Sequence, residues 1–316
     1  MKHTIHPILL LFFIAPLLSA GTGIQMDPNP PAKWPLMVRI DQAIEVTVIK
    51  EDTKADIYIY QTPNFEYHSD IKLGTGLVRE FSKIFETTLF AVKQCPLGLN
   101  PRMEPPRYQV QLFRTREEYL QAGGSAGSGG VYMGAQRKVL VPLESLNVSI
   151  RKQRVARGSG EKDNSTLIHE ITHQVMHDWL RFLPIWCIEG TAEYFRMIPY
   201  RSGAFNCGKT SPKDYAKNLK NFVPIERLLS ISDTEWKRGL TDGTGQDNYL
   251  SAGLLCYYLV HLDGDGDARR FKNYLKIIAE TGNPKLALPA LLDGRTPKQL
   301  EEELKRAYKI KERLTL

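Results

Sequence analysis

The sequence predicts an α+β protein in which most of the strands precede most of the helices. Short runs rich in β-branched and aromatic residues, which are typical of strands, are concentrated in the first half of the chain. Segments with apolar residues at helical spacing dominate from Asp214 onward. The chain has 316 residues, of which 42% are hydrophobic and 24% charged, as in an ordinary globular protein with a sizeable core.

The amino terminus has the pattern of an export signal. Lys2 precedes an apolar run from Ile8 to Leu18, and small residues occupy positions 19–21. The run is short for a membrane span, and the small residues mark a plausible cleavage site. We therefore expect residues 1–20 to be a signal peptide and the protein to be exported, either periplasmic or extracellular. An uncleaved membrane anchor is the alternative interpretation, and no other segment approaches a membrane span.

The next segment, 21–43, is rich in proline and predicts a linker. Residues 44–205 are expected to form an α+β region. Strands are predicted over 44–49, 57–61 and 108–113, a hairpin over 131–133 and 138–143, an amphipathic helix over 77–93 and a short helix over 116–121.

The main chemical signal of the chain is the pentapeptide His-Glu-Ile-Thr-His, from His169 to His173. A helix is predicted over 166–181, because Asn164 and Ser165 are good N-cap residues and apolar residues then recur at helical spacing. Two histidines four apart project from one helix face and can bind one zinc ion, and Glu170 between them can reach a water molecule at that ion. A helix with two surface histidines is the alternative interpretation.

A third ligand is needed, and it separates the classes of zinc protein. In metzincins a third histidine comes six residues after the second, but here that position is Trp179. We interpret His177, one further turn along the same helix, as a residue that supports the site or the fold.

A second helix, which can begin at Pro184, offers the missing ligand. It places Glu189 and Glu193 four apart on one face. Glu189 can bind the metal and leave the fourth position open, as in a catalytic site, while Glu193 can bind the outer nitrogen of one histidine and fix its tautomer. A solvated helix carboxylate is the alternative interpretation of Glu193.

Together the two motifs resemble those of the gluzincin metallopeptidases, the group of thermolysin-like and M1-aminopeptidase-like enzymes. The second motif reads Leu-Pro-Ile-Trp-Cys-Ile-Glu-Gly-Thr-Ala-Glu-Tyr from Leu183 to Tyr194, and it is most similar to a little-characterised bacterial branch. In that group the glutamate before the glycine is the third zinc ligand, which corresponds to Glu189. The chain has no Gly-x-Met-Glu-Asn exopeptidase signature, so the resemblance does not support trimming from the amino terminus.

The resemblance also implies a zincin-like fold, in which a mixed sheet packs on the active-site helix and a mainly helical C-terminal subdomain completes the cleft. We assign that subdomain to residues 206–316, where helical spacing occurs over 223–231, 249–262, 268–280 and 297–309. In gluzincins a strand at the sheet edge borders the cleft and can pair with an extended peptide. The hairpin strand 131–133 is our candidate for that edge.

One further residue follows from the resemblance. Tyr249 corresponds to the M1-type tyrosine that points at the metal and hydrogen-bonds the developing oxyanion. A neutral phenol can donate such a bond. A core or interface aromatic is the alternative interpretation of Tyr249.

Charge and cysteine content add further expectations. The net charge is +7, and the one basic cluster, 151–157, lacks interleaved aromatics, so we expect a solvated loop and no nucleic-acid partner. Four cysteines permit two disulfides in three connectivities, and a bridge between Cys187 and Cys207 could brace the metal site. The aspartates of 263–267 are expected to form a turn and cap a helix rather than bind calcium.

The function expected from these observations is that of an exported, zinc-dependent peptidase of endopeptidase type with one zinc ion per chain and a peptide or protein substrate. His169, His173 and Glu189 would hold the ion, and Glu170 would act as general base and then deliver the proton to the leaving amine. Two alternatives remain open: a zinc hydrolase of a non-peptide bond, and a non-catalytic envelope module that keeps the fold for binding.

Overall fold

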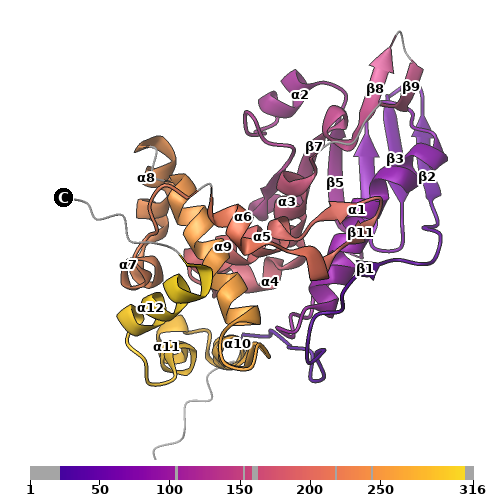
Figure 1. Cartoon of the computed structure of the whole chain (residues 1–316). Helices are drawn as coiled ribbons and strands as arrows, with labels where there is room; N and C mark the ends of the chain where they lie inside the picture. Colours follow the sequence, from indigo (N-terminus) through magenta and orange to yellow (C-terminus); the bar gives the residue numbers. More distant parts are fainter. Residues whose placement is uncertain are drawn as a thin grey trace, which may run out of the picture.

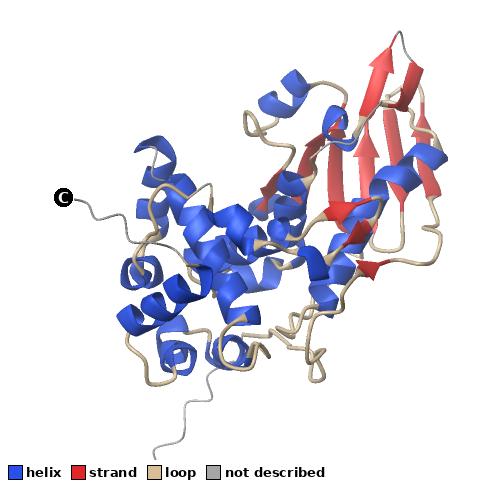
Figure 2. Cartoon of the chain, in the orientation of Figure 1, coloured by secondary structure: helices blue, strands red, loops and turns tan. Residues whose placement is uncertain are grey.

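The computed structural model describes residues 22–103, 106–151, 154–158, 163–217, 219–242 and 245–309. It is a mixed α+β structure, so the predicted class is confirmed. Figure 2 shows the strands gathered at one side of the molecule and the later helices at the other. The predicted signal peptide, 1–20, lies outside the described residues. Among the described helices, none is both long enough and apolar enough to cross a membrane.

The main sheet of the described chain is six-stranded and mixed, in the order β2-β3-β4-β5-β7-β6. Its strands are β2 (Thr47–Asp52), β3 (Ile57–Gln61), β4 (Phe65–Ser69), β5 (Tyr108–Phe113), β6 (Val131–Met133) and β7 (Lys138–Pro142). The pairs β4–β5 and β5–β7 are parallel, and the other pairs are antiparallel. The short strand β6 therefore forms one free edge of the sheet.

One face of this sheet is apolar and is covered by helix α1 (Thr75–Gln94) (Figure 1). Alternate residues of a strand point to one face, which places Phe65 and Tyr67 of β4 toward the helix. Their rings contact Phe85 of α1 at centroid distances of 5.4 Å each, and Tyr67 also meets Phe81 at 5.3 Å. This aromatic layer fixes α1 on the sheet.

Three helices continue from this layer into the centre of the molecule: α3 (Ser165–Val175), α5 (Ile185–Met197) and α9 (Gly245–His261). Helix α3 packs against α1 and α5, and α5 packs against α9. The last contact is close, because a Cβ atom at Gly190 would lie 2.8 Å from the Ala252 carbonyl oxygen, and one at Gly253 would lie 2.9 Å from Glu193 Cβ. Glycine at both positions lets α5 and α9 approach each other.

The remaining elements surround this centre. The short helices are α2 (Arg116–Gln121), α4 (His177–Leu180), α6 (Pro212–Ala216), α7 (Ile225–Ser230) and α8 (Asp233–Asp242), and the last three are α10 (Arg269–Thr281), α11 (Pro284–Leu292) and α12 (Pro297–Tyr308). A small sheet joins β1 (Val38–Arg39), β11 (Ala204–Phe205) and β10 (Tyr200–Arg201), and a separate hairpin joins β8 (Val148–Arg151) and β9 (Arg154–Arg157).

The described part of the predicted linker, 22–43, makes defined contacts with the body. The Asp27 N–H donates to the Gly98 carbonyl at 2.9 Å. Trp34 packs its ring against Phe195 of α5 at a centroid distance of 5.9 Å, and Val38 pairs with Phe205 in the small sheet.

Several predicted elements are confirmed at their bounds, namely the strands 57–61 and 108–113 and the helix 116–121. The helix predicted over 166–181 is interrupted at Met176, where φ is −95° and ψ is 13°, and continues as α4. The strand predicted over 44–49 begins later, at Thr47, since the Ile44 carbonyl instead accepts a hydrogen bond from Arg79 Nε at 2.9 Å.

Two further expectations are wrong. The basic cluster 151–157 is not a loop throughout, because Arg154–Arg157 pairs with Val148–Arg151 as a β-hairpin, with residues 152–153 outside the described chain. The bridge between Cys187 and Cys207 is absent, since all four cysteines are free thiols. Cys187 lies in α5 with its neighbouring thiol on Cys256 of α9, and that neighbour raises its pKa further after burial has raised it.

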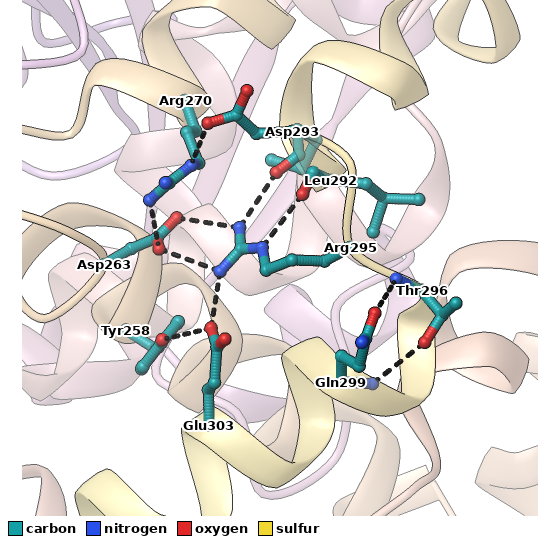
Figure 3. Close-up of polar contacts among 10 residues, drawn as sticks. Tyr258, Asp263, Arg270, Leu292, Asp293, Arg295, Thr296, Gln299 and Glu303 are labelled. Carbon is teal, nitrogen blue, oxygen red and sulfur yellow. Dashed lines mark hydrogen bonds and ion pairs between the residues drawn. The ribbon is translucent and has the colours of Figure 1, made fainter.

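The turn that follows α9 holds a buried network of charges, which Figure 3 shows. Asp263, 5% exposed, accepts two bonds from the guanidinium of Arg295, at 2.9 and 3.2 Å, and one from Arg270 at 2.8 Å. Arg295 also donates to Glu303 of α12, and Arg270 donates to Asp293. The network joins the end of α9 to α10, α11 and α12. The prediction that this segment is an aspartate turn is confirmed, and Asp267 accepts a hydrogen bond from the Arg269 N–H at 3.0 Å, but the N-cap position of α10 is Ala268 and not an aspartate.

Replacing Arg295 with methionine is expected to destabilise the protein by about 3 kcal/mol, because it removes the bidentate partner of a buried carboxylate. Chemical denaturation with a two-state fit would measure the loss. Lys217→Met is the matched control, since Lys217 pairs with Asp214 at the surface and such pairs contribute about 0.5 kcal/mol. Equal stability of the two variants would contradict the role assigned to the network.

A half-buried histidine, His261, makes the stability of this region depend on pH. Tyr194 of α5 donates a hydrogen bond to Nε2 of His261 at 2.8 Å, and the tilted ring of Tyr257 packs against the same imidazole at a centroid distance of 4.4 Å. Burial lowers the pKa of His261 from 6.5 to about 4. As the pH falls from 6.5 to 4, His261 is therefore protonated in the unfolded chain but stays neutral in the folded chain, and this difference lowers the free energy of unfolding.

We expect stability to be complete above pH 6.5 and to fall by about 2 kcal/mol more in the wild type than in His261→Gln as the pH drops to 4.5. Glutamine keeps a polar group near the Tyr194 hydroxyl but does not titrate. Unfolding free energies measured for both proteins between pH 7 and 4.5 would test this. Parallel curves would show that His261 is not the linked group.

Candidate metal centre

Helices α3 and α5 bring the central residues of the site together. His169 and His173 are four apart in α3 and so share a face, and Glu189 of α5 lies opposite them. Three potential ligand atoms, one from each residue, lie within 4.8 Å of one another. The group could therefore hold a metal ion.

The atoms that converge are all potential electron-pair donors. Nε2 of His169 and Nε2 of His173 are 2.9 Å apart, and Oε2 of Glu189 lies 3.1 Å from the first and 3.2 Å from the second. The three side chains are only 9%, 11% and 15% exposed. Such an arrangement is favourable only when positive charge, carried by a proton or a cation, lies among the three atoms.

Behind this group lies Glu193, with its side chain 2% exposed. Oε1 of Glu193 is 2.9 Å from Nδ1 of His169, and Arg196 donates to the same oxygen at 2.9 Å. The two atoms are within hydrogen-bond distance, but their geometry is not that of a hydrogen bond, so the contact between Glu193 and His169 is a close charge contact. The side chain of Glu193 is placed to select the tautomer of His169 that leaves Nε2 free for a ligand.

The electrostatics of the group favour a cation. Burial alone would raise the pKa of Glu189, but the charges of His173 and His169 and their hydrogen bonds hold it well below its usual range. Burial alone would lower the pKa of His169, but Glu189 and Glu193 outweigh it and raise the pKa to about 10. Both carboxylates are thus ionised and act on the same imidazole.

Glu170 lies at the edge of this group rather than in it. Its Oε2 accepts a hydrogen bond of 2.8 Å from the backbone N–H of Tyr132 in β6. The other oxygen of this carboxylate, Oε1, has no hydrogen-bond partner among the described residues, so it is free to act on a substrate or a water molecule.

Tyr249, near the start of α9, also borders the site. Its ring lies 6.1 Å from that of His169 and meets Trp236 of α8 edge-on at 5.1 Å. Burial, followed by the negative charge of Glu189, raises the pKa of Tyr249 to about 12. The phenol is therefore protonated at neutral pH and can donate a hydrogen bond.

The donor set fits zinc. Two imidazole nitrogens and one carboxylate oxygen are the ligands of many catalytic zinc sites, which keep one position open. The buried Nδ1 of His169 has a carboxylate beside it, as zinc-binding histidines usually have. Two surface hollows of the described chain lie elsewhere, one between α1 and the β10–β11 hairpin and one beside β1, so we assign no part of the metal chemistry to them.

The chain matches none of the protein-family models and none of the curated proteins with which it was compared. All six residues that the sequence singled out, His169, Glu170, His173, Glu189, Glu193 and Tyr249, lie in or beside one group. Two neighbours, Arg196 and Trp236, were not expected, whereas a third, Tyr132, lies in the strand 131–133 that was our candidate for the edge beside the site. Of the first two, only Arg196 left a signal in the sequence, since it lies three residues after Glu193 and such pairs meet on a helix.

Proposed function

We propose that the protein is an exported zinc-dependent peptidase of gluzincin type. One observation carries the proposal: two histidines of one helix and a glutamate of the next converge, and a second glutamate, Glu170, follows His169 in the same helix. Zinc at this position would supply a Lewis acid that activates water and polarises a carbonyl group. A binding module would need the ligands but not Glu170, which favours an enzyme.

The residues of the chain would divide the work of the reaction. Glu170 would take a proton from the attacking water and deliver it to the leaving amine, with Oε2 held by the Tyr132 N–H and Oε1 free. Tyr249 would donate a hydrogen bond to the oxyanion that develops on the scissile carbonyl. Glu193 would hold His169 in place, and Arg196 would hold Glu193.

The finer fold belongs to the same proposal. A mixed sheet beside a helix that carries both histidines is compatible with a zincin arrangement, in which the helices after residue 206 would complete the cleft. Strand β6 is a free edge of the sheet and touches Glu170, which suits an extended peptide that adds to this edge.

A peptide-library cleavage assay on the zinc-loaded chain, with Glu170→Gln as control, tests the proposed function. Cleavage by the wild type that is lost in the control would support a peptidase and define its specificity. Bound zinc without cleavage of any peptide would instead favour a hydrolase of a non-peptide bond. Equal cleavage by both proteins would refute the role of Glu170.

A further inference from the structure

A second stripe of polar side chains runs along α3, the helix that carries His169 and His173, and onto the start of α4. Glu170 and Gln174 are four residues apart in α3, and His177 opens α4 directly after the interruption at Met176. All three side chains hydrogen-bond to residues of the sheet at or near its free edge, in β5, in β6 and in the turn between β6 and β7. Gln174, 1% exposed, donates to the Gln109 carbonyl at 2.7 Å and to the Arg137 carbonyl at 3.3 Å, which anchors the helix to the sheet.

The other two members of the stripe meet at a single residue, Tyr132 of β6. The Tyr132 N–H donates to Glu170 Oε2 at 2.8 Å, and its phenolic oxygen lies 2.6 Å from Nδ1 of His177. The two rings also pack edge to face, with centroids 6.1 Å apart. The backbone N–H of Tyr132 bonds to Glu170 and not to β7, so this N–H points toward the free edge of the sheet.

Both partners of the side-chain bond are uncharged at neutral pH. Burial raises the pKa of Tyr132, so the phenol keeps its proton. Burial, followed by the positive charge of Arg137, lowers the pKa of His177, so the imidazole is neutral. With the imidazole in its Nε2–H tautomer, the Tyr132 hydroxyl donates and His177 Nδ1 accepts, and we assign the bond this direction.

We propose that His177 and Tyr132 are positioning residues for Glu170. His177 holds the Tyr132 side chain, and this fixes the backbone of β6 so that its N–H restrains one oxygen of Glu170 and leaves the other free for the reaction. This inference rests on the proposed function, in which Glu170 is the general base. The physical link itself, from His177 to the Tyr132 amide, exists with or without catalysis.

Side-chain changes at two positions separate this link from simple packing. Tyr132→Phe removes the hydroxyl and keeps the ring and the backbone N–H. His177→Leu removes the acceptor, whereas His177→Asn restores one, because the Asn oxygen can take the place of Nδ1. Tyr58→Phe in β3 is the matched control, since it makes the same chemical change in a buried strand residue that three strands, β4, β5 and β7, separate from β6.

The first measurement is amide hydrogen exchange at Tyr132, in protein prepared with and without zinc. We expect exchange about fivefold faster in Tyr132→Phe and His177→Leu, with recovery in His177→Asn and no change in Tyr58→Phe. Glu170→Ala should also expose this amide, since it removes the acceptor. Unchanged exchange in Tyr132→Phe and His177→Leu would overturn the proposal even if the protein proves to be no peptidase.

The second measurement is steady-state kinetics on a cleaved peptide. We expect kcat to fall about tenfold in Tyr132→Phe and His177→Leu with KM little changed and zinc content intact, and the double variant to be no worse than either single one. Rescue of kcat by His177→Asn would support positioning. A loss confined to thermal stability or to zinc content would overturn it, whereas a wild type that cleaves no peptide would count against the proposed function and not against the link.

Discussion

Glu170→Gln is expected to lower kcat by about three orders of magnitude and to leave one zinc ion bound per chain. General bases contribute about 10² to 10⁴ in rate, and an amide cannot accept the proton that a carboxylate accepts. The substitution is otherwise mild, because the glutamine oxygen can still accept the Tyr132 N–H that holds Oε2 of Glu170 at 2.8 Å. The fold, the ligands and KM should therefore be preserved.

Kinetics on a peptide from the library, together with the zinc content of the same preparation, would measure this effect. Glu226→Gln, at a surface position of α7, is the matched control and should retain wild-type kcat and zinc. A Glu170→Gln protein with more than about a tenth of wild-type kcat would contradict the assignment of Glu170 as general base.

His173→Ala is expected to abolish both zinc binding and activity. The substitution removes one of three ligands, and the two that remain, His169 and Glu189, cannot enclose the ion. Zinc should also lose its effect on stability. In the wild type, zinc at a thousandfold excess over Kd should stabilise the folded state by about 4 kcal/mol, if it does not bind the unfolded chain.

Thermal unfolding with and without zinc would measure this second effect. His68→Ala is the control, because His68 lies in β4 and bonds to Glu66 and Gln109, away from the metal group. A His173→Ala protein that retains stoichiometric zinc and a zinc-dependent rise in Tm would show that the ion, if any, binds elsewhere.

The elements that could be predicted from sequence are those whose burial pattern is local. In 57–61 four of the five residues are Ile or Tyr, which favour strands, and in 108–112 apolar and polar residues alternate, as on one covered and one open face of the sheet. Helix α8 could not be predicted from sequence. Trp236 is the one large buried side chain among its described residues, and the ring that Trp236 packs against, Tyr249, belongs to another helix. Helix α11 was missed because Pro289 lies inside it, where proline usually ends a helix.

The same distinction applies to the site. The proximity of His169 and His173 is a property of one helix, and the spacing of Glu189 and Glu193 is a property of the next, so both could be predicted from periodicity. The hydrogen bond from the Tyr132 backbone to Glu170 could not, because it depends on how α3 docks against the edge of the sheet. The periodicity of residues within one helix or one strand does not specify how the two elements pack together.

The most direct test of the central claim is the metal content of the purified protein, measured by inductively coupled plasma mass spectrometry for the wild type and for His173→Ala. The account predicts one zinc ion per wild-type chain and none in the variant. A wild-type chain that binds no zinc, even after incubation with the ion, would contradict the metal centre and every catalytic role derived from it.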